Sequence, residues 1–227
     1  LIAASRFKNS HVTAIDLSVN SLAYAKRKSI ELGFTNIDYI QADILDLKNL
    51  QTKFDIIESA GVLHHMNDPA AGWKALIACL KPNGLMRIGL YSELARNHII
   101  KARSIIAKAD IETTKEAIVG FRKQIIDKDD TLLHLLQENR DFYSTSSLRD
   151  LLFHVQEVRF TIPQISSLLD ELGLSFAGFE FSKKAIIDTF KTFYSKEEDL
   201  YDLNKWSEYE ISNPNLFFGM YQFWVQK

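Results

Sequence analysis

The sequence has few of the features that place a protein outside the cell or in a membrane. Its 227 residues include a single cysteine, Cys79, so no disulfide can form within the chain, as is typical of a reducing compartment. No apolar run is long enough to span a bilayer, and no basic segment followed by an apolar one opens the chain. We therefore expect a soluble, cytoplasmic protein without membrane insertion.

An excess of charge of one sign and the common metal-ligand patterns are also lacking. The formal net charge is −2, which gives no whole-chain attraction for nucleic acid. No paired cysteines and no His-x-x-x-His occur, and the adjacent histidines His64 and His65 rarely reach one metal together. We therefore expect neither a nucleic-acid partner nor a bound metal.

Strands and helices alternate along much of the chain. The length and the 46 % hydrophobic composition suffice for one sizeable core, so we expect a single domain with an embellishment. Helices that separate successive apolar strands are typical of right-handed βαβ units around a parallel sheet. This predicts an α/β, Rossmann-like fold. The expected strands cover residues 11–17, 37–43, 54–58, 85–91, 175–181 and 217–225.

The alternation stops between about residues 93 and 160, where four helical patterns follow one another. Thr113 with Glu116 is a candidate capping box for one of these helices, and Thr161 with Gln164 for the helix after them. The segment is predicted to be a helical insertion that covers one edge of the sheet.

The stretch Phe54–Met66, FDIIESAGVLHHM, is the best candidate for a functional site. Its first half is a short buried strand, and Ser59 and Ala60 follow, before His64 and His65. Ligands of open α/β sheets bind at the carboxyl ends of the strands. We therefore predict that the site lies at this junction.

Two acids, Asp16 and Asp43, end the preceding strands and should reach the same crevice. A carboxylate in such a place commonly accepts hydrogen bonds from ribose hydroxyls, and a second one can accept from an adenine amino group. The alternative is that each acid only caps a helix or lies in a solvated loop. Two such acids followed by the Phe54–Met66 junction favour the nucleotide site.

Four segments together resemble the class I S-adenosylmethionine-dependent methyltransferases: AIDLS, QADILDL, FDIIESAGVLHHMNDP and LKPNGLMRIGLYS. In that family's order they are the second to fifth strands, and the last two predicted strands fit the sixth and the antiparallel seventh. LYSELAR with DFYSTSSLRDLLFHVQEVRFTIPQI is similar to a bacterial subgroup in which this domain follows tetratricopeptide repeats. The resemblance implies S-adenosyl-L-methionine as cofactor and upstream repeats of the same protein as a partner.

The resemblance assigns six residues to this cofactor. They are Asp16 at the ribose hydroxyls, Leu17 on an apolar face of the adenine, Asp43 at the adenine amino group with Ile44 beside it, and Ser59 and Ala60 along the methionine portion. The glycine-rich turn that the family places after its first strand should lie before Leu1. We therefore expect residues 1–227 to be a single, N-terminally truncated methyltransferase domain without that strand and loop.

Three histidines are candidates on the substrate side. His64 and His65 follow the cofactor-lining residues and can act as a base there, or they can pack the turn before the next helix. His154 is a candidate for a substrate lid or for helix packing. Tyr91 ends its strand and should point toward the same crevice. The other histidines, His11, His98 and His134, are expected on strand or helix surfaces.

The leading hypothesis is methyl transfer, in line, to a positioned nucleophile of an unidentified acceptor, which is a small molecule or a protein. A nicotinamide-dependent oxidoreductase also uses an acid at the end of its second strand, but FDIIESAGVLHHM is not the segment that such enzymes place at their fourth strand. A catalytically silent module that binds the cofactor and docks a protein is the third hypothesis.

Overall fold

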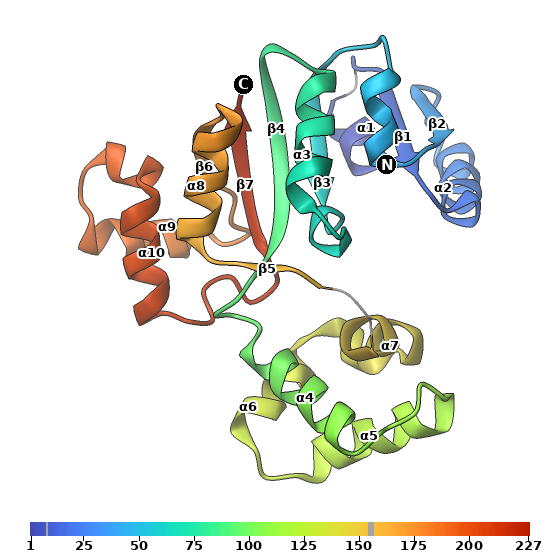
Figure 1. The fold of residues 1–227 in the computed structure, drawn as a ribbon, viewed down its shortest axis with the longest axis vertical. Coiled ribbons are helices and arrows are strands. Elements are labelled where there is room, and N and C mark those ends of the chain that lie inside the picture. Colours follow the sequence, from blue (N-terminus) through green and yellow to red (C-terminus); the bar gives the residue numbers. More distant parts are fainter. Residues whose placement is uncertain (8, 154–156) are drawn as a thin grey trace.

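The computed structural model describes residues 1–7, 9–153 and 157–227. Figure 1 shows an α/β part, with helices packed on strands, and a separate group of helices below it. The two are joined where β5 runs beside the end of β4. Within the described ranges, no helix is long and apolar enough to cross a membrane.

The first part of the chain forms a small parallel sheet with a helix between its strands. Val12 lies opposite Ile37 and Asp16 opposite Gln41. Ser18 caps the intervening helix, because its hydroxyl accepts a hydrogen bond from the N–H of Ser21 at 3.2 Å. The elements are α1 (Ile2–Arg6), β1 (Val12–Asp16), α2 (Val19–Glu31) and β2 (Ile37–Gln41).

A larger mixed sheet forms the centre of the molecule, in the order β3-β4-β7-β6, with the short β5 beside the end of β4. β3, β4 and β5 are parallel, whereas β7 is antiparallel to both of its neighbours. This confirms the predicted α/β fold with an antiparallel last strand. The strands are β3 (Phe54–Ala60), β4 (Leu80–Ser92), β5 (Arg159–Phe160), β6 (Ser175–Phe179) and β7 (Tyr221–Gln226).

The two sheets are not joined to each other by strand pairing in the described residues. β1 and β3 are therefore both edge strands. Because β3 has no neighbouring strand on one side within the described part of the chain, its apolar side chain Ile56 is 37 % exposed. An apolar side chain in a parallel strand is ordinarily covered. The prediction that a further strand and a glycine turn belong to this domain stays a prediction.

The main core lies between the larger sheet and its helices. Trp73 of α3 and Phe223 of β7 are both fully buried, with ring centroids 6.1 Å apart. Asp68 caps α3 and Pro69 is its first residue, as the sequence predicts. The predicted capping box of Thr161 and Gln164 begins α8. The helices are α3 (Pro69–Cys79), α8 (Ile162–Leu172), α9 (Lys184–Phe193) and α10 (Leu203–Ser212).

Residues 97–153 form a second unit, the helical unit, with its own apolar core. Four helices are present there, as the patterns predict, but the cap of α5 is one residue later than expected. Thr114, not Thr113, accepts from the N–H of Ala117 at 3.3 Å. The helices are α4 (Asn97–Lys108), α5 (Lys115–Asp127), α6 (Thr131–His134) and α7 (Thr145–Phe153).

His98 is buried, not exposed as its helical position suggested. It is 2 % exposed, and its ring stacks on Phe218, with centroids 4.7 Å apart. Desolvation, with a smaller effect of the positive charge on Arg96, lowers the pKa of His98 to about 4. His98 therefore joins the helical unit to the loop before β7 as a neutral side chain.

This burial predicts a loss of stability in mild acid. Below its ordinary pKa of 6.5, His98 takes up a proton in the unfolded chain but stays neutral in the fold down to about 4. Its contribution to the free energy of unfolding should therefore fall by about 2 kcal/mol between pH 7 and pH 5. Urea unfolding of the wild type and of His98→Gln at both pH values measures it. If the free energy of unfolding of the two proteins depends equally on pH, His98 is not the buried neutral group responsible for the loss.

Candidate functional site

The two strand-terminal acids lie at the same edge of the small sheet. Asp16 ends β1, its carbonyl accepts from the N–H of Ala42 at 3.3 Å, and Asp43 is the next residue. One oxygen of each carboxylate accepts a backbone N–H at 2.8 Å, from Ser18 and Leu45 respectively. In the described residues the other oxygen of each accepts no hydrogen bond. In each of the two carboxylates, one oxygen therefore binds the backbone, as the alternative role of these acids predicts, and the second oxygen is available as an acceptor.

Ser59 and Ala60 lie inside β3, which runs two residues further than predicted. Ser59 is 5 % exposed, and its Oγ has no hydrogen-bond partner among the described residues. A buried hydroxyl without a partner is costly, so it marks a place where a ligand group is suited to bind. Ala60 and Leu17 are exposed, and Ile44 is half-buried.

Gly89 of β4 lies directly opposite Ala60 and lets the two strands approach closely there. A Cβ added at Gly89 would meet the Cα of Ala60 at 2.9 Å and the sulfur of Met220 at 2.7 Å. The Met220 side chain can move aside, but the backbone of Ala60 cannot move without shifting the end of β3. Gly89 is thus a site-shaping residue that sequence reasoning missed.

The variant Gly89→Ala is expected to displace Ala60 and to lower the free energy of unfolding by about 1–3 kcal/mol, as for other overpacked positions. Affinity for S-adenosylhomocysteine should fall with it. Gly120→Ala is the matched control, because a Cβ there meets nothing within 4 Å. The assignment fails if both variants bind the ligand as the wild type does.

Three aromatic rings gather where the β3 junction meets the end of β4. His64, fully buried, stacks on Tyr91 with ring centroids 3.7 Å apart. His65 is half-buried and lies edge-on to His64 at 4.4 Å and to Tyr91 at 6.0 Å. The burial of His64 favours a packing role, which leaves His65 and Tyr91 as the partly exposed members. The third candidate, His154, lies outside the described residues.

A buried charge cluster lies beside these rings and was not predicted from the sequence. Arg96 donates to both carboxylate oxygens of Glu157, at 2.8 and 2.7 Å, and both side chains are almost fully buried. Arg103 donates to Glu157 at 3.0 Å, and Arg159 lies 3.8 Å from it. Arg96 and Glu157 are far apart in sequence, so no local pattern reveals the pair.

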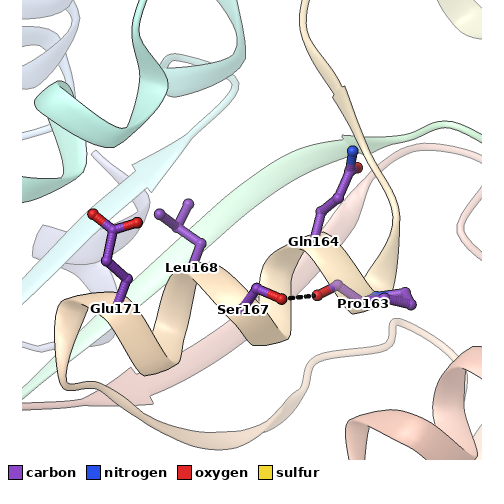
Figure 2. Close-up of a pocket in the computed structure, with 5 residues that line it drawn as sticks. All are labelled: Pro163, Gln164, Ser167, Leu168 and Glu171. Carbon is purple, nitrogen blue, oxygen red and sulfur yellow. Dashed lines mark hydrogen bonds between the residues drawn. The ribbon is translucent and has the colours of Figure 1, made fainter.

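A shallow groove runs along α8 (Figure 2). Its one charged side chain, Glu171, already accepts from Lys74 at 2.8 Å. No predicted site residue lines it, so it gives no support for a second catalytic site. The lining residues are Pro163, Gln164, Ser167, Leu168 and Glu171.

Comparisons with known proteins agree with this geometry. A family described as "Methyltransferase domain" matches residues 1–141. The chain is 27 % identical over 212 residues to an uncharacterized protein of Synechococcus sp., covering 89 % of this chain and 51 % of that protein. It is 37 % identical over 82 residues to the ubiquinone biosynthesis O-methyltransferase of Actinobacillus pleuropneumoniae serotype 7, covering 34 % of this chain and 35 % of that enzyme.

Among solved structures, PKMT2 from Rickettsia typhi has a TM-score of 0.68 with 15 % identity, covering 98 % of this chain and 44 % of that chain. The same protein in complex with AdoHcy has a TM-score of 0.66 with 16 % identity, covering 98 % and 45 %. The fold is thus that of the class I methyltransferases, the class whose cofactor is S-adenosylmethionine. The chain belongs to the methyltransferase domain family. It spans about half the length of the first relatives it matches.

Proposed function

We propose that the protein containing this chain transfers a methyl group from S-adenosylmethionine to an oxygen or nitrogen nucleophile of a small molecule or a protein. The observation that carries the proposal is the carboxyl edge of the parallel strands. Available carboxylate oxygens of Asp16 and Asp43 follow β1 and β2, and the unpartnered Ser59 hydroxyl lies near the end of β3. These are the places where open α/β sheets bind nucleotides.

The residues present fit the proposed cofactor. The second oxygen of Asp16 suits the ribose hydroxyls, and an ionised Asp43 can accept from an adenine amino group. The buried Oγ of Ser59 gains a partner if a polar group of the methionine portion binds beside Ala60. When bound, the cofactor supplies a methyl group already activated by the sulfonium.

The main task of the protein is then to align the acceptor. Positioning alone can supply about 7–11 kcal/mol, whereas a general base adds about 10²–10⁴-fold. His65 is the better placed candidate for such a base, because it is half-buried while His64 is covered. The helical unit, joined to the sheet beside this edge, serves in this proposal as the lid that excludes water.

Two measurements on the intact protein test the proposal. Calorimetric titration should show binding of S-adenosylhomocysteine and not of NAD; the reverse result would favour the oxidoreductase hypothesis. Incubation with S-adenosylmethionine labelled in the methyl group should then label a fraction of a cell extract. Binding of the cofactor without any labelled product would favour the catalytically silent module.

A further inference from the structure

Tyr91 is held between two flat groups. The His64 ring lies 3.7 Å from its centroid at an interplanar angle of 26°. The guanidinium carbon of Arg96 lies 3.6 Å from the same centroid. Both are contact distances for stacked groups, so the two cannot share one face of the ring. Arg96 and His64 therefore cover opposite faces of Tyr91.

The Arg96 guanidinium is itself fixed by a buried carboxylate. Arg96 is 3 % exposed, and Glu157, whose side chain is 1 % exposed, binds it through two hydrogen bonds. Such a paired arrangement sets the plane of a guanidinium as well as its position. A cation over an aromatic face is also attractive, more so when water is excluded. The plane of Tyr91 is thus set through Arg96 by Glu157.

Tyr91 is placed where its orientation matters for a reaction. It is the penultimate residue of β4, two residues after Gly89, which packs on Ala60. It is half-buried and lies edge-on to the half-buried His65. The ring therefore borders the edge at which the acceptor is proposed to meet the cofactor.

We propose that Arg96, oriented by Glu157, is a positioning residue for the methyl acceptor. It holds the Tyr91 ring in contact with His64, and this fixes the surface of Tyr91 and His65 that faces the acceptor. This inference rests on the proposed methyltransferase function. Because transfer needs an in-line approach, a displacement of about 1 Å can cost about 100-fold in rate. Arg96 acts without touching the acceptor, through the ring that it covers.

Two matched variants distinguish the positioning of Tyr91 from a contribution to stability alone. Arg96→Lys keeps a positive charge near Glu157 but removes the flat group from Tyr91. Arg103→Lys makes the same chemical change at another arginine that binds Glu157, at 3.0 Å, and that has no ring contact with Tyr91 among those described. Each is compared with the wild type for labelled-methyl transfer to the accepting extract fraction, for S-adenosylhomocysteine affinity and for melting temperature.

Arg96→Lys is expected to lower kcat/KM for the acceptor about 10- to 100-fold, with unchanged affinity for S-adenosylhomocysteine. Arg103→Lys should melt at a similarly reduced temperature but keep kcat/KM. Equal losses of kcat/KM in both variants, or none in Arg96→Lys, would overturn the proposal.

A second readout does not depend on the reaction. In NMR spectra, the Tyr91 ring current should shift the ring protons of His64 upfield, and Arg96→Lys alone should weaken this shift. If the wild type transfers no methyl group, the proposed function fails, and the His64 signals still show whether Arg96 holds the ring. Unchanged signals in Arg96→Lys would overturn the positioning role by themselves.

Discussion

Replacing Asp16 by alanine is expected to weaken the binding of S-adenosylhomocysteine to the intact protein by about 100-fold or more. The account gives Asp16 two hydrogen bonds to ribose hydroxyls, and a hydrogen bond to a charged group is worth about 1.5–3 kcal/mol. The change leaves the strand intact, because Asp16 is exposed and its Oδ1 bonds only the N–H of Ser18. Calorimetric titration measures the affinity.

Asp38→Ala is the matched control for this prediction. Asp38 is an exposed acid of the same small sheet, lying in β2 one residue from its start, and its Oδ2 bonds His11 at 2.7 Å. Asp38 is the second residue of β2, whereas Asp16 is the last residue of β1 and lies at the proposed site. Removal of the Asp38 carboxylate should therefore leave the affinity for S-adenosylhomocysteine unchanged. Equal affinities of the Asp16→Ala and wild-type proteins would remove Asp16 from the cofactor site.

The variant Glu157→Gln is expected to lower the free energy of unfolding by about 3–5 kcal/mol. The carboxylate is the buried partner of Arg96 and Arg103, and its loss leaves guanidinium charge without compensation. The penalty arises from the unpaired charge that stays behind, not from the strength of the original pair. Chemical denaturation of the wild type and the variant measures the difference.

The same substitution at an exposed ion pair provides the comparison. Glu171 pairs with Lys74 at 2.8 Å, but both side chains are more than half exposed. Glu171→Gln should therefore change the free energy of unfolding by less than about 1 kcal/mol. If the two variants lose similar amounts of unfolding free energy, burial does not determine how much the Glu157 cluster contributes to stability.

Features of the fold that depend on neighbouring residues were predicted from the sequence. The Thr161–Gln164 capping box and the Asp68–Pro69 helix start are local hydrogen-bonding and backbone preferences, and both are present. Alternating apolar segments located every described strand except the short β5, although β3 extends to Ala60, β4 begins already at Leu80 and β7 begins only at Tyr221.

Features that depend on distant residues were missed. The burial of His98 follows from Phe218, which belongs to another part of the chain. Likewise, the pairing of Arg96 with Glu157 joins positions 61 residues apart. Helical spacing gives the face of a helix but not the element that covers it, so a histidine or an arginine on such a face can be exposed or buried.

In the candidate site, too, features set by neighbouring residues were predicted and features set by distant residues were missed. Strand ends are local features, so Asp16, Asp43 and Ser59 were found from their positions after apolar runs. In the structure Asp16 is the last residue of β1, Ser59 is the penultimate residue of β3, and Asp43 lies two residues beyond the end of β2. The stacking of His64 on Tyr91 depends on the register of β3 with β4, which the sequence does not specify. Their roles toward a cofactor and an acceptor stay predictions.

The most direct test of the central claim is a crystal structure of the intact protein with S-adenosylhomocysteine. The account predicts the ribose hydroxyls at the Asp16 carboxylate, the adenine amino group at Asp43, and the homocysteine portion beside Ser59 and Ala60. A ligand bound elsewhere, with Asp16 and Ser59 uncontacted, would contradict the account.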